Sequence, residues 1–343
     1  MKLNINIKLF LSALFLLLLS LFYGTNANAS APIDGSAKAD QNACGGNGSG
    51  TITRPDTTSC ELEPDIFKIT FLRIDFCTSD PAPPTTGTPL GRASCSTFFK
   101  NDDGAEVTVV KGVAGTIGEA SDYKMVPYGT YTHGVITMKT TFKYTASVLF
   151  NGNMGDTDGN GNTTTCVTKE PAGGASTIIY GFHNSLNAAN SNVDCSANAV
   201  AEEIIVGVNT MTMDSDNDCN HKWNFTGSSG VVAAYLLEVD GTLHNNVGAE
   251  GGDQIDQVVS TDPATAGCTS GTSNGVTQIM GVMALGDPIV VDPSTTGFQM
   301  QYNTTQGMML DMSGTANDMY KFDAAFFDFT IKMKKARARG AWR

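Results

Sequence analysis

Residues 156–162 read Asp-Thr-Asp-Gly-Asn-Gly-Asn, a stretch in which side-chain oxygens alternate with other residues. Oxygen donors at loop positions one, three and five, with glycine at position six, begin an EF-hand type of calcium loop. Val167 replaces the bidentate glutamate expected at position twelve, so we predict a shortened, structural calcium site that takes a further ligand from elsewhere. An acidic turn with positive φ angles is the alternative. The predicted ligands are Asp156, Asp158, Asn160 and Asn162.

A second acidic cluster repeats the alternation, with carboxylates at Asp214, Asp216 and Asp218. Cys219 stands where the loop would need glycine. Because three neighbouring carboxylates repel one another, a bound cation would stabilise them. We therefore predict a second calcium site here. The alternative is a solvated acidic loop that a disulfide holds through Cys219.

No sequence pattern predicts an enzyme. The histidines show neither His-x-x-x-His nor Glu-x-x-His spacing, so zinc or copper catalysis is not indicated. Residues 271–275 spell Gly-x-Ser-x-Gly, but this nucleophile motif follows a strand, and a loop-forming stretch precedes it at residues 262–268. Carboxylate pairs that cleave glycosides meet only in space, so a carbohydrate-active protein stays an alternative. The histidines are His133, His183, His221 and His244.

The eight cysteines are even in number, which in an exported chain indicates disulfides. The strongest predicted pair is Cys77–Cys95, because it would close a Pro-, Thr- and Gly-rich stretch at residues 78–94. Two further predicted pairs are Cys44–Cys60 and Cys166–Cys195. Cys-x-x-Cys spacing is absent, so a structural zinc site of that kind is not supported.

The first residues predict a signal peptide. Lys2 and Lys8 precede an apolar run at residues 9–23, and small residues follow at residues 27–29. The run is about 15 residues, shorter than the roughly 20 that cross a bilayer as a helix. We expect cleavage after Ala29 and no transmembrane span in the mature protein; an uncleaved anchor is the alternative. The predicted location is extracellular or at the cell surface, with the periplasm as an alternative compartment.

The mature body is strongly acidic. The whole chain has a formal net charge of -13, but residues 30–331 hold 13 basic and 34 acidic residues, a net charge of -21. Such a body argues against nucleic acid as a partner, because phosphate binding requires a basic field. Charged residues make up only 16% of the chain, and abundant Gly, Thr, Asn and Ser are typical of β structure with many turns.

Apolar alternation and β-branched or aromatic residues predict strands separated by turn residues. We expect an all-β, antiparallel β-sandwich, as one large or two consecutive sandwich domains, with any helix limited to a short one near residues 183–192. The expected strands cover residues 66–77, 106–113, 131–150, 176–182, 203–213, 231–239, 275–285 with 289–291, 298–302, 308–312 and 320–333.

The predicted organisation divides the chain at changes in composition. The expected segments are a signal peptide (1–29), a flexible polar arm (30–59), a β-sandwich domain (60–150), an acidic Gly/Asn-rich loop (151–171), a second β-sandwich portion (172–333) and a basic tail (334–343).

Residues 127–131 read Pro-Tyr-Gly-Thr-Tyr and come directly before the strongest predicted strand. This segment resembles the Pro-x-Gly-x-Tyr corner of prealbumin-like β-sandwich modules, in which Pro and Gly make the turn and Tyr begins the next strand. The resemblance covers about a dozen residues. It implies a sandwich of seven or eight strands used for scaffolding, adhesion or sugar contact, and it leaves the second half of the chain unassigned.

Residues 324–333 predict an amphipathic strand, with Phe329, Ile331 and Met333 among the residues on its apolar side. One interpretation is the closing strand of its own sheet. The other is that this strand, or the arm at residues 30–59, adds to the sheet edge of a neighbouring copy while the basic tail meets the acidic body.

The expected function is that of a non-enzymatic secreted or cell-surface protein, in adhesion or a structural surface assembly, with calcium as a structural ion. Its expected partners are other copies of itself and surface glycans. A carbohydrate-binding or carbohydrate-active protein is the alternative. Trp223 and Trp342 are the only tryptophans, which offers little for sugar stacking.

Overall fold

The structure is a computed structural model. It divides the chain into two units, Met1–Ala31 and Pro32–Arg343, and every described residue belongs to the second. The described residues are 51–52, 60–85, 87–109, 115–156, 163–171, 178–180, 192–208, 212–213, 219–220, 222–227, 230–243, 276–303, 307–312, 318–325 and 328–335.

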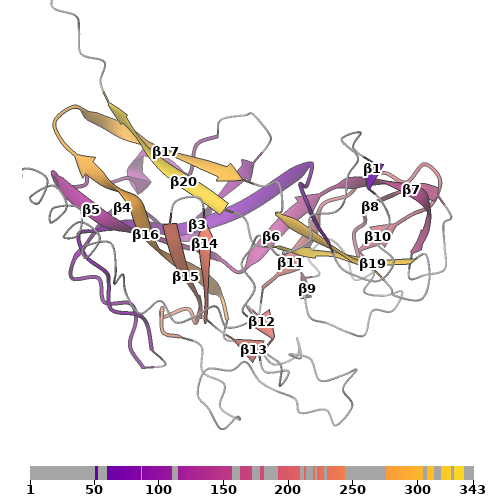
Figure 1. The fold of residues 1–343 in the computed structure, drawn as a ribbon, viewed down its shortest axis with the longest axis horizontal. Coiled ribbons are helices and arrows are strands. Elements are labelled where there is room, and N and C mark those ends of the chain that lie inside the picture. The colour runs from indigo at the N-terminus through magenta and orange to yellow at the C-terminus, as the bar shows by residue number, and fades with distance from the viewer. Residues whose placement is uncertain are drawn as a thin grey trace, which may run out of the picture. The chain divides into compact units, whose positions relative to one another are not determined.

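The described part of the chain is almost entirely β-strand, and the predicted all-β fold class is confirmed (Figure 1). Its only helical element is a 3₁₀ turn, Ala120–Asp122. The strands are β1 Thr51–Ile52, β2 Cys60–Leu62, β3 Ile66–Cys77, β4 Cys95–Val109, β5 Gly129–Lys139, β6 Thr141–Thr145, β7 Ser147–Asp156, β8 Thr163–Thr168, β9 Ile178–Tyr180, β10 Val193–Asp194, β11 Ile204–Gly207, β12 Thr212–Met213, β13 Cys219–Asn220, β14 Lys222–Gly227, β15 Gly230–Leu237, β16 Gln278–Val291, β17 Thr295–Asn303, β18 Met308–Met312, β19 Asp318–Ala324 and β20 Asp328–Lys335.

The strands form two large sheets and two ribbons. The nine-stranded sheet has the order β14-β15-β16-β5-β3-β6-β11-β9, with β4 on β3. The seven-stranded sheet has the order β10-β8-β7-β19-β18-β2, with β1 on β7, and the ribbons are β12-β13 and β17-β20. Three pairings are parallel (β1 with β7, β9 with β11, and β19 with β7) and the others antiparallel. Strands from both predicted portions, 60–150 and 172–333, share the nine-stranded sheet.

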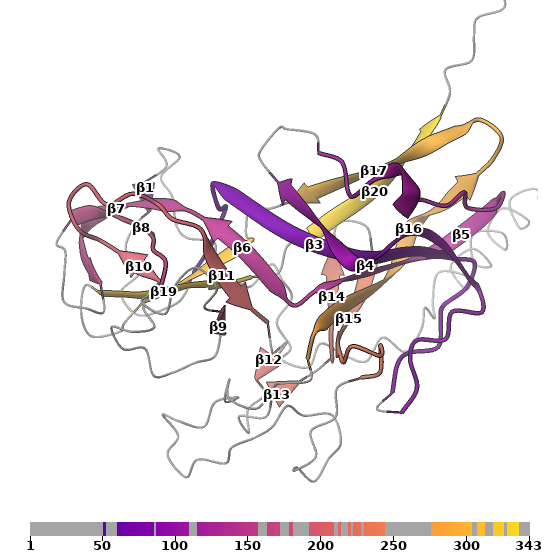
Figure 2. The same cartoon turned by 180° about the vertical axis from the view of Figure 1, so that it is seen from behind.

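The chain passes from one large sheet to the other at Ala146, between β6 and β7 (Figure 2). Ala146 is 1% exposed and its N–H donates to Thr168 Oγ1 at 3.1 Å, so the crossing point is buried and hydrogen-bonded. The stretch at residues 131–150, which the sequence predicts to be strand, is therefore divided among three strands, β5, β6 and β7. In the same way, the strand predicted over residues 320–333 is two, β19 and β20, which lie in different sheets.

A register shift in β3 decides which side chains enter the main core. Phe67, Ile69 and Phe71 are buried in this core before the shift, and Ile74 and Phe76 after it. The shift falls between Phe71 and Arg73 in the pairings of β3 with β4 and with β5. Because a bulge moves every later side chain to the opposite face, apolar residues at odd positions before the shift and at even positions after it pack into one core.

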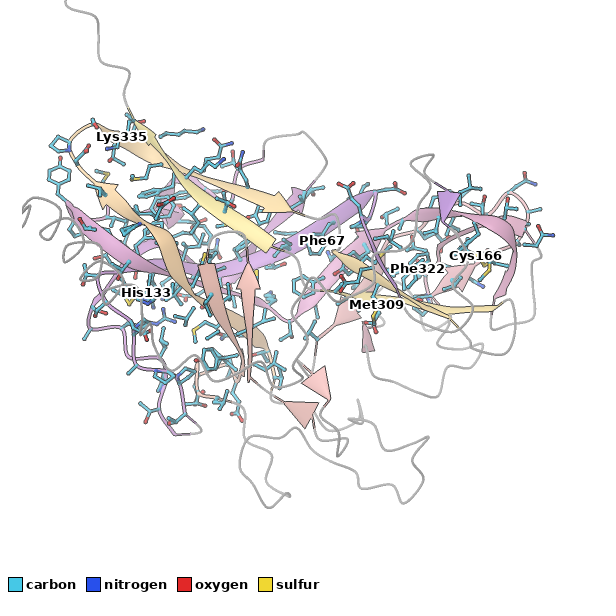
Figure 3. The ribbon with its side chains drawn as sticks, viewed as in Figure 1. Phe67, His133, Cys166, Met309, Phe322 and Lys335 are labelled. Carbon is cyan, nitrogen blue, oxygen red and sulfur yellow. A yellow bond between two sulfur atoms is a disulfide. The ribbon has the colours of Figure 1, made fainter. Side chains whose placement is uncertain are left out.

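The β17-β20 ribbon covers part of the nine-stranded sheet (Figure 1). Phe298 of β17 stacks on Phe76 of β3, with ring centroids 4.7 Å apart. Gly134 of β5 leaves room for Ile331 of β20, whose Cδ1 lies 3.6 Å from the position of a glycine Cβ. Phe67 and Phe322, labelled in Figure 3, bring residues of both large sheets into the same core.

Tyr144, buried in the core, and Tyr302, partly buried against it, predict a loss of stability at alkaline pH. Burial raises the pKa of the Tyr144 phenol well above its ordinary value, and the Asp323 charge adds to the shift. Burial also raises the pKa of Tyr302. The folded protein keeps these protons while the unfolded chain releases them above about pH 10, so their contribution is complete below that pH and is lost as the pH rises.

We expect urea titrations to show the free energy of unfolding falling above about pH 10, by up to about 1.4 kcal/mol per pH unit for each buried tyrosine. Tyr144→Phe should make this decline shallower. The Tyr144 hydroxyl has no hydrogen-bond partner among the described residues, so the substitution should not destabilise the protein at neutral pH. A decline of the same slope in both proteins would contradict the assignment.

A buried carboxylate beneath a disulfide-closed loop

The loop at residues 78–94 is closed at its base and paired along its length. Cys77 and Cys95 form the predicted disulfide. The Thr78 N–H donates to the Ser94 carbonyl at 2.9 Å, and the Gly91 N–H donates to the Ala82 carbonyl at 2.9 Å. The loop therefore behaves as an irregular hairpin that is covalently joined where it leaves the sheet.

This loop covers the face of the nine-stranded sheet that lies opposite the main core. Leu90 of the loop is 6% exposed and packs in a second, smaller cluster with Val135 and Val282. The Leu243 N–H donates to the Thr85 carbonyl at 3.0 Å, which ties the loop to the segment after β15. The sheet thus has apolar packing on both faces.

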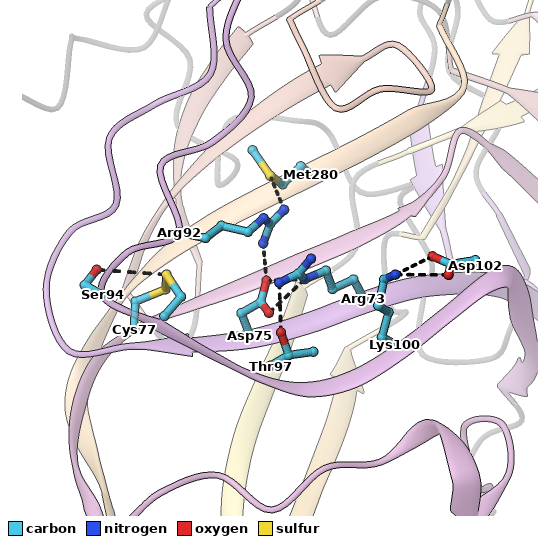
Figure 4. A network of polar contacts seen from close by, with 10 residues as sticks. Arg73, Asp75, Cys77, Arg92, Ser94, Thr97, Lys100, Asp102 and Met280 are labelled. Carbon is cyan, nitrogen blue, oxygen red and sulfur yellow. Dashed lines mark hydrogen bonds and ion pairs between the residues drawn. A yellow bond between two sulfur atoms is a disulfide. The ribbon is translucent and has the colours of Figure 1, made fainter.

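Asp75 lies under the loop with its side chain fully buried. Arg73 Nε lies 2.9 Å from each of the two carboxylate oxygens (Figure 4). Arg92, from the loop, donates through Nη1 to Asp75 Oδ2. Arg73 Nη2 donates to Thr97 Oγ1 of β4 at 2.8 Å. One carboxylate therefore connects β3 and the loop, and Arg73 extends the network to β4.

Burial changes the electrostatics of the ion pair between Asp75 and Arg92. Burial lowers the pKa of the Arg92 guanidinium, and the Asp75 carboxylate opposes this shift by favouring the charged form. The other end of the guanidinium reaches the thioether of Met280, with Nη2 3.8 Å from Sδ. Because Met280 is fully buried and sulfur is a weak acceptor, Asp75 is the main partner of Arg92.

The Asp75 network holds the loop to β3 through ion pairs and hydrogen bonds. Both oxygens of the Asp75 carboxylate accept from guanidinium groups of Arg73 or Arg92, so its hydrogen bonds join β3 to the loop. The sequence contains a signal for this site: Arg73 and Asp75 stand two apart in an apolar strand, so they can share one face. Arg92 has no such signal, because it joins the site only when the loop folds back.

A hydroxyl, an imidazole and a carboxylate meet at the base of the same loop. Thr132 Oγ1 lies 2.9 Å from His133 Nδ1, and His133 Nε2 lies 3.8 Å from Asp80 Oδ1. However, Thr132 donates its only hydroxyl proton to the Thr78 carbonyl at 3.1 Å. His133 Nδ1 must then be the donor to Thr132. These contacts connect β5 to the loop. They do not activate the Thr132 hydroxyl as a nucleophile, because the imidazole does not accept the hydroxyl proton.

The side chains of the predicted calcium ligands lie outside the described residues. Asp156 is the last residue of β7, and its side chain is outside the described residues. The others, Asp158, Asn160, Asn162, Asp214, Asp216 and Asp218, also lie outside them, as does most of the helix predicted near residues 183–192. Within the ranges that the structure describes, no group of three or more His, Cys, Asp or Glu side chains could hold a metal ion.

Two of the three predicted disulfides lie within the described residues, and both form. Cys166 of β8 bonds Cys195, which follows β10. Cys44, in the third predicted pair, is outside the described residues. The same part of the chain has no helix long and apolar enough to cross a membrane.

The corner at residues 127–131 has a defined internal geometry. The Tyr131 hydroxyl donates to the Pro127 carbonyl at 2.8 Å, and Tyr131 is 2% exposed. Its ring lies 6.1 Å from that of Phe76. No family model, curated protein or solved structure matches this chain. The resemblance to prealbumin-like modules therefore stays a prediction, and function has to be inferred from the geometry.

Proposed function

We propose that this protein is exported and acts as a non-enzymatic β-sandwich in a surface assembly, built from copies that join at their strand edges. Two disulfides support an oxidising compartment. The predicted signal peptide supports export. Adhesion through the assembled surface fits this scaffold best, because the buried polar groups described above, such as Asp75, bind to the protein's own loop.

The observation that carries the proposal is the β17-β20 ribbon. It is a two-stranded sheet, and neither strand has a second partner strand among the described residues. Each strand therefore has an outer edge on which another chain could add a strand. β20 packs on the core of its own molecule through Ile331 and Met333. Its edge opposite β17 has no partner strand among the described residues, so this edge could pair with a strand of another copy.

The charges on β20 predict how two copies would be oriented in the proposed contact. The side chains of Lys332 and Lys334 in β20 are exposed, and the body of the chain is acidic. Exposed lysines on an isolated edge discourage pairing with a second basic edge. They favour pairing with an acidic surface, and this selects a head-to-tail arrangement of copies over a symmetric one.

Charge reversal at the ribbon tests the assembly. We expect the mature protein to form oligomers in light scattering coupled to size-exclusion chromatography, and Lys332→Glu with Lys334→Glu to reduce them to monomers. Lys100→Glu with Lys124→Glu is the matched control, since both side chains are exposed and lie outside the ribbon. Deleting residues 320–343 would not be a clean test of assembly, because the deletion also removes Phe322, which is fully buried.

Two results would overturn the proposal. Monomers of the wild-type protein at all concentrations and in negative-stain images would exclude assembly through strand edges. A clear hit in a glycan-array screen, together with a monomeric wild-type protein, would favour carbohydrate binding instead.

Calcium binding stays a prediction of the sequence, and thermal melting tests it directly. A ligand that binds only the folded protein raises its stability, by about 2.7 kcal/mol at a hundredfold excess over its dissociation constant. We expect a higher melting midpoint in calcium than in chelator, and a smaller difference for Asp158→Asn with Asp216→Asn. Equal midpoints in calcium and chelator for the wild-type protein would remove calcium from the account.

A further inference from the structure

The two disulfides within the described residues differ in their access to solvent. Cys77, Cys166 and Cys195 are all fully buried. Cys95 is partly exposed, and it packs against the smaller apolar cluster without belonging to the buried part of that cluster. Because a disulfide is broken by a thiolate that attacks one of its sulfur atoms, Cys95 is the one cysteine of these four that a dissolved thiol can approach.

The surroundings of Cys95 leave this approach open. The disulfide joins the last residue of β3 to the first residue of β4, so it lies where the pairing of the two strands ends. Thr78 and Ala93, at the base of the loop, are exposed. Ser94 Oγ lies 4.0 Å from Cys95 Sγ (Figure 4), so a small polar group lies beside this sulfur. Exposed disulfides are the ones that exchange readily with thiols.

The Cys166–Cys195 bond has the opposite environment. Both cysteines belong to the main core, together with Val193 of β10. The Cys195 carbonyl also accepts from Thr163 Oγ1 at 2.8 Å, which holds the segment after β10 against β8. A thiol can reach this bond only when the core opens, and core strands open with free energies that approach that of global unfolding.

Breaking the Cys77–Cys95 bond leaves the sheet itself paired. The two cysteines are cross-strand partners, and the pairing of β3 with β4 continues along both strands without them. Reduction removes only the covalent closure of the loop at residues 78–94. Noncovalent contacts then hold the loop alone, through the ion pair of Arg92 and the packing of Leu90 in the smaller cluster.

We propose that the Cys77–Cys95 bond is a thiol-exchange site, which makes closure of the loop depend on the redox state of the compartment. Its co-reactant is a dithiol. One thiolate of the dithiol attacks Cys95 Sγ, and the disulfide breaks as Cys77 leaves with the electron pair and takes up a proton from water. The second thiol, after losing its proton, attacks the mixed disulfide and releases Cys95, which takes up that proton. The dithiol is oxidised to a disulfide, and the protein gains two thiols.

Reduction changes the surface of the nine-stranded sheet. A loop that is no longer closed at its base opens more often, because its open state regains conformational freedom. Opening withdraws Leu90 from Val135 and Val282, so apolar surface on this face of the sheet becomes exposed to solvent. The inference does not depend on the proposed assembly, because it concerns a bond within one molecule.

Timed reduction of the mature native protein with dithiothreitol tests the exchange site. Free thiols are alkylated at each time with N-ethylmaleimide, and peptide mass spectrometry locates the labels. We expect Cys77 and Cys95 to be labelled about tenfold or more faster than Cys166 and Cys195, which serve as the internal control. Equal rates for the two pairs, or labelling of Cys77 and Cys95 only after denaturant is added, would overturn the proposal.

Trypsin cleavage after Arg92 reports whether the loop is released. We expect this cleavage to be several-fold faster in protein reduced at Cys77 and Cys95 than in the oxidised protein. Cleavage after Lys143, in the middle of β6, should stay equally slow in both forms. Unchanged cleavage after Arg92 would overturn release of the loop, and so would a parallel rise at Lys143, because the sheet itself would then be unfolding.

Both assays can be repeated on the charge-reversed ribbon variant, Lys332→Glu with Lys334→Glu. The reduction rates and the cleavage rates should match those of the wild-type protein, whether or not the wild-type protein assembles. Loss of the difference between the two disulfides in this variant would show that assembly protects the Cys166–Cys195 bond, and would overturn the assignment to burial within one chain.

Discussion

Asp75→Ala should lower the free energy of unfolding by about 3–5 kcal/mol, the cost of removing one partner from a buried ion pair. The carboxylate is fully buried and accepts from Arg73 and Arg92. Its removal leaves two guanidinium groups facing each other, one of them partly desolvated under the loop. Urea titration of the two proteins, monitored by near-ultraviolet circular dichroism, would measure the difference.

The exposed ion pair of the neighbouring strand is the control for this effect. Lys100 and Asp102 of β4 are 2.9 Å apart, with side chains 42% and 82% exposed. Exposed pairs contribute about 0–1 kcal/mol, so Asp102→Ala should change stability little. Combining Asp75→Ala with Arg92→Met should recover part of the loss, because the second substitution removes an unpaired buried charge. Equal effects of Asp75→Ala and Asp102→Ala would contradict the role assigned to Asp75.

Replacing both members of a disulfide by alanine should cost about 3 kcal/mol for Cys77–Cys95 and slightly more for Cys166–Cys195. The difference follows from the sequence separations of 18 and 29 residues, since a longer closed loop restricts the unfolded chain more. Losing both bonds should then remove about 6–7 kcal/mol, a large part of the 5–15 kcal/mol that typically stabilises a protein.

Thermal melting of the two double variants and of the fourfold variant would measure these losses. The wild-type protein in a strong reductant serves as a comparison, and it should melt at or below the midpoint of the fourfold variant, because that variant keeps the other four cysteines. A Cys77→Ala, Cys95→Ala protein that melts with the wild type would show that hydrogen bonds and the Asp75 network hold the loop without the disulfide.

The bounds of two strands could be predicted to the residue. β3 and β18 begin and end where the sequence indicates. Short strands without a clear apolar pattern, such as β8 and β10, could not be predicted, because their pairing depends on the assembled sheet and the Cys166–Cys195 bond. The bulge in β3 could not be predicted either, because both registers of an apolar strand look alike in the sequence.

The disulfides could be predicted because each joins cysteines that are close in sequence. The Asp75 network could be predicted only in part. Arg73 and Asp75 are local neighbours on one strand, whereas Arg92 and Met280 reach the site from distant segments. Long-range contacts of this kind depend on how the sheet is assembled, and a single sequence carries no direct record of that assembly.

The central claim is that this chain folds as a β-sandwich whose loops are cross-linked by local disulfides. Peptide mapping of the mature protein by mass spectrometry, without reduction, tests it most directly. The account predicts linked peptides that join Cys77 to Cys95 and Cys166 to Cys195. Free thiols at these four positions, or links between the two pairs, would contradict it.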